Sequence, residues 1–167
     1  MRRTELFGES QEGEEREHPV VEVDRGCVLV VEDDDRVREL MALLMRSEGY
    51  EVIELGDGLE ALQYMAAATV YRREMRPPDL VVADIQMPSF TGFDLLMGMR
   101  EYRCRPPVML VTGTVDEEVR DEARRLGAAC VMQKPIDIDA FIDAVAVSMA
   151  ESASREERRM VAPYLDA

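Results

Sequence analysis

Residues 80–88 have the sequence LVVADIQMP, in which a short apolar run leads directly into Asp84 and ends at Pro88. The run is rich in β-branched residues and does not alternate between apolar and polar positions. This pattern predicts a strand buried on both faces, as in a parallel sheet. Asp84 would then lie at the carboxyl end of the strand, where open α/β sheets bind ligands. We therefore take Asp84 as the centre of a candidate functional site.

Short apolar runs and amphipathic segments alternate five times along the chain. Strands are predicted at residues 27–31, 51–55, 79–83, 108–111 and 128–132, and each is followed by apolar residues at helical spacing. Such alternation predicts an α/β fold, a doubly wound five-stranded parallel sheet with helices on both faces. Helix starts are predicted at the capping residues Asp57, Thr91 and Thr114. Leu59 and Met97 are among the residues predicted to face the core.

Length and composition set the domain organisation and exclude several classes of protein. The 167 residues predict a single domain at 26–150, with an acidic disordered tail at 1–25. The polar segment 151–167 is a short C-terminal extension, which could continue the last helix or fray. A formal charge of −15 disfavours nucleic acid and anionic membranes as partners. No apolar run approaches the ~20 residues of a membrane span. Cys27, Cys104 and Cys130 form no CxxC pair, which favours buried thiols and a cytoplasmic location.

Lys134 is the only lysine among 20 basic residues. A general preference for arginine explains the other 19 but not this exception. A site that requires a compact ammonium on a flexible stem would explain it, because a guanidinium cannot replace that group.

Polar residues follow four of the predicted strands: Glu32 and Asp33, Asp84, Thr112 and Lys134. We assume the strand order 2-1-3-4-5, which is common among known doubly wound sheets. In this order the first and third strands are adjacent. Three carboxylates in one crevice repel one another, so either a pKa rises or a cation binds. An open, all-oxygen site suits Mg²⁺. With Lys134 and Thr112 added, the set has the parts of a phosphoryl-transfer site.

Each of these residues has an ordinary structural explanation when it is taken alone. An Asp after a strand is usually a turn or cap residue, and an acidic run before a helix usually favours the helix dipole. We interpret Asp34 and Asp35 in that way, as helix-start residues. The functional hypothesis depends on the coincidence of all the other polar residues at one edge of the sheet.

Four segments resemble the receiver domain of bacterial two-component response regulators, the CheY-like family with a flavodoxin-like fold. They are VLVVEDD at 28–34, PDLVVADIQMP at 78–88, VTG at 111–113 and Lys134-Pro135, and the resemblance covers roughly residues 26–150. It implies that Asp84 is the phospho-acceptor and that Lys134 contacts the phosphoryl group. It further implies a Mg²⁺ site formed by Glu32, Asp33, Asp84 and the backbone carbonyl of Gln86, and a switch hydroxyl on Thr112.

The resemblance also implies a function. We expect a stand-alone response regulator receiver that accepts a phosphoryl group from a sensor histidine kinase or a phosphotransfer protein and then switches protein–protein interactions. Its only catalysis would be Mg²⁺-dependent autophosphorylation and autodephosphorylation. A second copy of the protein is a further expected partner, in a homodimer that forms through the face of the fourth helix, fifth strand and fifth helix. That face would include Arg120, Arg124, Val131 and Phe141.

Two features depart from the family pattern. Val131 occupies the position where receivers usually have Tyr or Phe, and no output domain follows residue 150, so the chain is either a stand-alone receiver or part of a longer protein. A haloacid-dehalogenase-type phosphatase would require a second acid at Gln86, and a flavin binder would require a phosphate loop and stacking aromatics. A degenerate receiver, acting as a phosphorylation-independent interaction module, remains the alternative. The retained acids, Thr112 and Lys134 argue against it.

Overall fold

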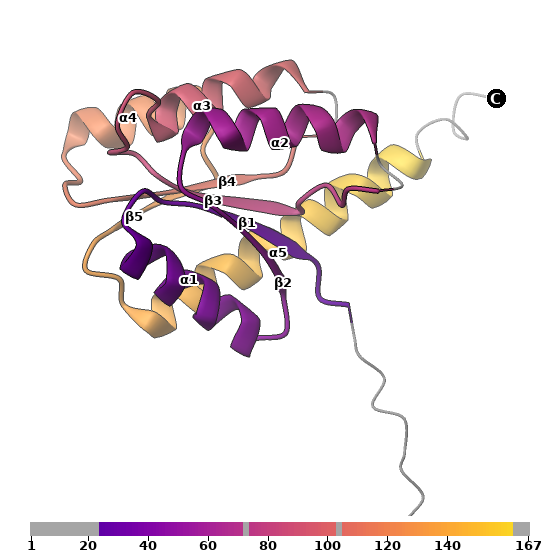
Figure 1. Ribbon diagram of the computed structural model, residues 1–167, viewed down its shortest axis with the longest axis horizontal. Coiled ribbons are helices and arrows are strands. Elements are labelled where there is room, and N and C mark those ends of the chain that lie inside the picture. The colour runs from indigo at the N-terminus through magenta and orange to yellow at the C-terminus, as the bar shows by residue number, and fades with distance from the viewer. Residues whose placement is uncertain (1–23, 72–73, 103–104, 162–167) are drawn as a thin grey trace, which may run out of the picture.

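The structure, a computed structural model, describes residues 24–71, 74–102 and 105–161. The predicted acidic tail, apart from its last two residues, and Cys104 lie outside these ranges. The chain runs through strands and helices in alternation (Figure 1): β1 (Cys27–Val31), α1 (Asp35–Ser47), β2 (Glu51–Leu55), α2 (Gly58–Val70), β3 (Leu80–Asp84), α3 (Gly92–Gly98), the short 3-10 helix η1 (Met99–Glu101), β4 (Val108–Thr112), α4 (Glu117–Leu126), β5 (Cys130–Gln133) and α5 (Ile138–Val161).

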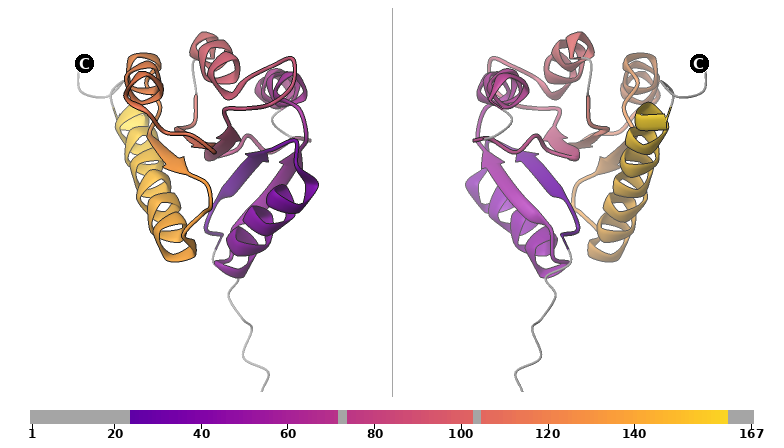
Figure 2. Two further views of the ribbon diagram at one scale, coloured as in Figure 1. Left: turned by 90° about the vertical axis from the view of Figure 1, so that its left-hand side faces the viewer. Right: turned by 90° about the vertical axis from the view of Figure 1, so that its right-hand side faces the viewer.

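The strands form one parallel sheet in the order β2-β1-β3-β4-β5, which confirms the predicted fold. Figure 2 shows α1 and α5 on one face of the sheet and α2, α3 and α4 on the other. Helix α5 continues to Val161, so the predicted polar extension begins as part of this helix. No helix among the described residues is long and apolar enough to cross a membrane.

The core has two parts, one on each face of the sheet. Leu29 and Val31 of β1 pack toward α2, α3 and α4, whereas Val28 and Val30 pack toward α1 and α5. Every residue of β1, β3 and β4 is buried, because successive side chains of a central strand enter opposite halves of the core. Full burial of one such aliphatic side chain stabilises the fold by about 1.5–3 kcal/mol.

Two of the three predicted helix caps are confirmed, and the third is wrong. The Asp57 carboxylate accepts hydrogen bonds from two backbone N–H groups at the start of α2, and Thr91 forms a capping box with Asp94. Helix α4 is capped by Asp116, whose Oδ1 accepts a hydrogen bond from Val119 N at 2.9 Å, and not by Thr114. The N–H and carbonyl groups of Thr114 instead form hydrogen bonds with the hydroxyl of Thr112, the last residue of β4.

The predicted core positions of Leu59 and Met97 are also wrong. Their side chains are 50% and 51% exposed. The buried positions of α2 are Gly58, Ala61, Met65 and Ala68, and those of α3 are Gly92, Leu95 and Leu96. Both sequences contain apolar residues on more than one side, so their spacing fits two rotations of the helix. Packing against the sheet selects the rotation that buries the small residues of α2.

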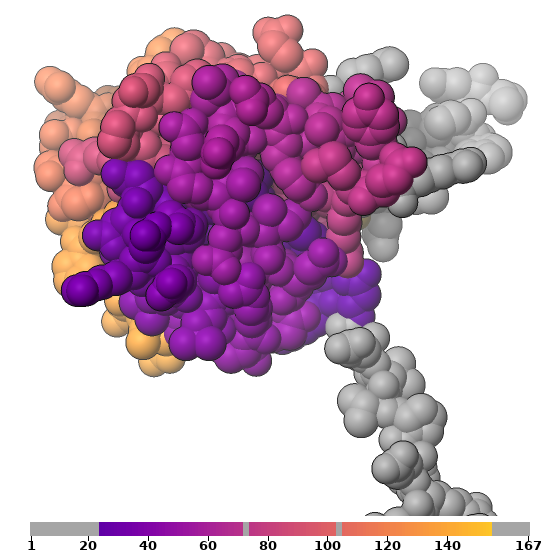
Figure 3. Space-filling view, viewed as in Figure 1, coloured from indigo at the N-terminus to yellow at the C-terminus, as the bar shows by residue number. Residues whose placement is uncertain are grey.

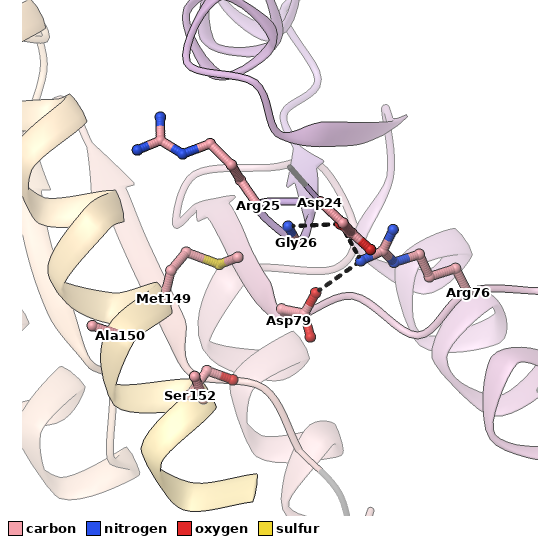
Figure 4. Close-up of a pocket in the computed structure, with 9 residues that line it drawn as sticks. Asp24, Arg25, Gly26, Arg76, Asp79, Met149, Ala150 and Ser152 are labelled. Carbon is pink, nitrogen blue, oxygen red and sulfur yellow. Dashed lines mark hydrogen bonds and ion pairs between the residues drawn. The ribbon is translucent and has the colours of Figure 1, made fainter. Parts of the chain in front are cut away.

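A network of charged side chains lies at the amino ends of the strands, at the opposite end of the sheet from Asp84. Arg76 donates a hydrogen bond to Asp24 Oδ1 at 2.8 Å and lies 3.7 Å from Asp79 Oδ2 (Figure 4). It also donates a hydrogen bond to Glu51 Oε2 at 2.9 Å. Asp79 Oδ2 in turn accepts a hydrogen bond from Cys27 N at 2.8 Å. The network joins the segments that enter β1 and β3 to the edge strand β2. Burial raises the pKa of the Cys27 thiol to about 12, in line with the buried thiol predicted there.

Candidate functional site

The carboxyl ends of β1 and β3 bring two acids together. Val31 pairs with Ala83 in the parallel register, so the residues that follow, Glu32 and Asp84, lie side by side. Both are buried, with side chains 1% and 7% exposed. The sheet order creates this proximity, because β1 and β3 are neighbours in space although α1, β2 and α2 separate them in the sequence.

Lys134 reaches the two acids from the far side of β4. Its Nζ donates hydrogen bonds to Glu32 Oε2 at 2.7 Å and Asp84 Oδ2 at 2.8 Å. Its backbone N–H bonds the carbonyl of Thr112 at 2.8 Å, which fixes the segment after β5 against the end of β4. The Lys134-Pro135 peptide bond is cis. The ammonium of Lys134, which follows β5, therefore bridges the two buried carboxylates at the ends of β1 and β3.

Burial and the hydrogen bonds of Lys134 act in opposite directions on the charges of this site. Burial raises the pKa of Glu32 above its ordinary value, and the hydrogen bond from Lys134 only partly offsets that rise. For Lys134 itself, burial favours the neutral amine, but hydrogen bonds to Asp84 and Glu32 outweigh this effect and raise its pKa. The ammonium therefore stays charged. The crevice holds more carboxylates than the single ammonium can neutralise.

The excess negative charge is concentrated at one point. Glu32, Asp33 and Asp84 each place a carboxylate oxygen within 4.8 Å of the other two. Asp33 is exposed, so one side of the cluster is open to solvent. Hard cations such as Mg²⁺ and Ca²⁺ prefer oxygen ligands of this kind. The three residues fit a site for such a cation.

The loop after β3 packs closely against Asp84. Gln86 N donates a hydrogen bond to Asp84 Oδ1 at 3.0 Å, so the backbone of Gln86 lies beside the acid. The predicted role of the Gln86 carbonyl as a metal ligand stays a prediction. Gly92 packs so tightly that a Cβ there would lie 2.4 Å from the carbonyl oxygen of Asp84. A side chain at Gly92 would therefore displace the end of β3.

The residues 28–146 match the family model described as the response regulator receiver domain. The chain belongs to the response regulator receiver domain family. Its sequence is 33% identical over 124 residues to the transcriptional regulatory protein PdtaR of Mycobacterium tuberculosis, a match that covers 74% of this chain and 56% of PdtaR. The chain thus spans little more than half the length of that relative.

One further comparison agrees with the family and another with the fold. The sporulation initiation phosphotransferase F of Bacillus subtilis is 30% identical over 118 residues, covering 71% of this chain and 89% of that protein. The crystal structure of the signal receiver domain of a putative Luxo repressor protein from Vibrio parahaemolyticus superposes with a TM-score of 0.70. It covers 79% of this chain and 95% of its own, and at 22% identity it supports the fold alone.

In this receiver domain, the hydroxyl of Thr112 is not bonded to the acids. Thr112 is the last residue of β4 and is 1% exposed. Its Oγ1 donates to the carbonyl of Thr114 at 3.2 Å and accepts from Thr114 N at 3.3 Å. The structure therefore places Thr112 beside the site, engaged with its own loop, whereas Glu32, Asp84 and Lys134 are in direct contact.

The expected output face of the receiver domain is partly wrong. Arg120 and Arg124 are exposed, and with Val131 they line a groove of about 250 Å³ between α4 and β5. Phe141 is fully buried in the core between the sheet and α1 and α5. The apolar side of α5 faces the sheet, so its largest side chain is unavailable to a partner.

Sequence reasoning missed one residue next to the acids. Arg38 of α1 donates a hydrogen bond from Nη1 to the carbonyl of Glu32 at 2.7 Å and forms an ion pair with Asp35. Nothing in the sequence distinguishes this arginine from the 18 others. The predicted helix-start role of Asp34 is correct, since Asp34 is the N-cap of α1.

Proposed function

We propose that this receiver domain accepts a phosphoryl group on Asp84 from a histidine kinase or a phosphotransfer protein and changes its protein contacts in response. The principal support is the buried Asp84 carboxylate at the carboxyl edge of β3, hydrogen-bonded to Lys134 beside Glu32. Membership of the receiver family and similarity to a relative named as a phosphotransferase also favour it. Two free thiols, Cys27 and Cys130, suit a protein that works in the reducing cytoplasm.

The chemistry assigned to the chain has two steps, the transfer of one phosphoryl group to Asp84 and its later hydrolysis. An oxygen of the Asp84 carboxylate forms a bond to phosphorus while the phosphorus–nitrogen bond of the donor's phosphohistidine breaks, and the electron pair leaves with the imidazole. The ammonium of Lys134, already bonded to Asp84, is placed to bind oxygens of the transferred group. Attack of water on the phosphorus of the acyl phosphate later breaks the bond to the Asp84 oxygen, releases inorganic phosphate and restores the free carboxylate. No other catalysis is proposed.

We assign the oxygen cluster to Mg²⁺. Glu32, Asp33 and Asp84 would supply carboxylate oxygens, and the carbonyl of Gln86 would complete the protein ligands. The uncompensated charge of the crevice and its open, solvent-facing side favour a cation that retains several waters. When bound, Mg²⁺ offsets the repulsion between the carboxylates and the incoming phosphoryl oxygens. Thr112 would then change its hydrogen bond from the Thr114 peptide to the phosphoryl group.

Phosphorylation with acetyl phosphate and Mg²⁺, read by phosphate-affinity electrophoresis, tests the assignment. The wild-type protein should give a shifted band that EDTA abolishes, and Asp84→Asn should give none. Asp57→Asn is the matched control, because asparagine caps a helix as well as aspartate does and Asp57 lies at the start of α2. A full-intensity band from Asp84→Asn would refute the assignment. A wild-type protein that is never modified, but still binds its partners, would support the degenerate receiver instead.

A further inference from the structure

Arg38 reaches from α1 to the loop that contains the acids. Its side chain is only 18% exposed, and its Nη1 donates a hydrogen bond to the carbonyl oxygen of Glu32 at 2.7 Å. Its Nη2 forms an ion pair with Asp35. A Cβ added to Gly56 would lie 3.3 Å from Nη1, so the guanidinium also packs against the backbone that follows β2. In the view of Figure 3, the N-terminal half of the chain, to which Arg38 belongs, makes up most of the visible surface.

The peptide unit between Glu32 and Asp33 sits in a backbone segment that is held from both sides. The N–H of Glu32 donates to the carbonyl of Leu55 in β2 at 3.1 Å. Its carbonyl accepts the hydrogen bond from Arg38. Asp34 then caps α1, which fixes the other end of the loop. Arg38 is the side chain that bonds the carbonyl of the peptide leading into Asp33, and Glu32 Oε1 accepts a weaker hydrogen bond from Asp34 N at 3.4 Å.

Asp33 has no comparable restraint on its own side chain. It is exposed, and no donor among the described residues bonds its carboxylate. Glu32 and Asp84, by contrast, are both held by Lys134. The direction of the Asp33 carboxylate therefore depends on the backbone before it, in which Arg38 bonds the Glu32 carbonyl.

We propose that Arg38 is a positioning residue for the cation site. It holds the peptide that directs Asp33 toward Glu32 and Asp84 and touches neither the cation nor the phosphoryl group. The inference rests on the proposed Mg²⁺ site. It makes a prediction opposite in sign to simple electrostatics, because removal of a positive charge near a cation site should strengthen cation binding. Loss of a positioning contact should weaken it.

The test compares two arginines on the same turn of α1. Arg38→Met removes the contact, and Arg36→Met removes an equal charge from an exposed residue whose guanidinium makes no hydrogen bond among the described residues. By calorimetric titration at fixed ionic strength, Arg38→Met should bind Mg²⁺ about tenfold more weakly, as is typical when a ligand loses its outer support. Arg36→Met should bind as tightly as wild type or more tightly. At saturating Mg²⁺, phosphorylation of Arg38→Met should approach the wild-type rate.

Two further measurements separate positioning from general damage. In metal-free protein, the backbone amide resonances of Asp33 and Asp34 should shift in Arg38→Met and stay in place in Arg36→Met. Arg38→Lys keeps the charge but cannot span both Glu32 and Asp35, so its Mg²⁺ affinity should lie between those of wild type and Arg38→Met; it also serves if the Met variant does not fold. Equal Mg²⁺ affinity in Arg38→Met and Arg36→Met would overturn the inference and leave the proposed function intact. A wild-type protein that binds no Mg²⁺ would overturn both.

Discussion

At the scale of single residues, the site depends on one ammonium between two buried carboxylates. Lys134 Nζ lies 2.7 Å from Glu32 Oε2 and 2.8 Å from Asp84 Oδ2, and the carboxylates are almost fully excluded from solvent. A buried carboxylate without a partner is strongly destabilising, so the contacts with the ammonium offset part of the cost of burying these two acids. A compact donor on a flexible stem can also leave one oxygen and bind another, as a phosphoryl acceptor site requires.

We therefore predict that Lys134→Arg is not a conservative change. The planar guanidinium is broader than an ammonium and cannot make both short contacts in the same space. Acetyl phosphate should still modify Asp84, because the nucleophile and the acidic cluster remain. The response of the Thr112–Thr114 loop to phosphorylation, measured by amide chemical shifts, should be lost. A wild-type response in Lys134→Arg would mean that the single lysine is an accident of composition.

The individual site residues differ in how far the sequence could predict them. Asp84, Glu32 and Lys134 were predictable because parallel strands bring their carboxyl ends to one edge, and the apolar runs mark where those strands end. Arg38 was not predictable, since its role depends on the path of its side chain across the loop. The hydrogen bond from Thr112 to its own loop is likewise a choice between rotamers that the sequence does not reveal.

At the scale of elements, the start of α4 shows how local polar contacts decide a boundary. Thr114 and Asp116 are both good capping residues, and Thr114 fits the capping-box spacing with Glu117. The structure uses Asp116, and the peptide of Thr114 instead bonds the hydroxyl of Thr112, which favours a helix start two residues later. The end of β4 therefore sets the first residue of α4.

Substitution of the two candidate caps should separate them by stability. Asp116→Ala should lower the free energy of unfolding by about 1 kcal/mol, the typical cost of a lost N-cap. Thr114→Ala should change it by less than about 0.5 kcal/mol, because the contacts of Thr114 with Thr112 come from its backbone. Urea denaturation monitored by circular dichroism measures both. A larger loss in Thr114→Ala than in Asp116→Ala would contradict the assigned cap.

Helix rotation is the element-scale property that the sequence left open. Helix α2 contains Leu59 and Leu62 as well as the smaller Ala61 and Ala68. Spacing alone favours the larger residues as the core face, but in the structure Ala61 and Ala68 are buried and Leu59 is half exposed. In α5 the predicted inward face is correct for Phe141, which for that reason cannot also belong to an exposed output face.

At the scale of the whole molecule, the two ends of the sheet have different tasks. The Arg76 network joins the amino ends of β1, β2 and β3 through partly exposed ion pairs. The carboxyl ends hold a cluster whose charge is not satisfied and a hydroxyl that bonds only its own loop. A ligand that binds the carboxyl edge more tightly in one conformation than in another would shift the population toward that conformation.

A comparison of amide spectra with and without the phosphate mimic beryllofluoride, in the presence of Mg²⁺, tests whether this domain switches. We expect shifts at Thr112 and Thr114, because the Thr112 hydroxyl should exchange its bond to the Thr114 peptide for one to the bound mimic. The β4–α4 loop would move with it and alter the groove lined by Arg120 and Arg124. Val131 is too small to swing between two positions as an aromatic ring does, so its own shift should be minor.

The controls are beryllofluoride without Mg²⁺ and beryllofluoride with Asp84→Asn, both of which should leave the spectrum unchanged. Shifts limited to residues 32–34 and 84–86, with residues 112–135 unaffected, would show that occupation of the site does not reach the groove. Among the described residues, the hydroxyl of Thr112 is the side-chain group whose hydrogen bonds connect the end of β4 to the loop before α4. Thr112→Val removes that hydroxyl at nearly constant volume. It should therefore confine the beryllofluoride response to the acids while leaving the mimic bound.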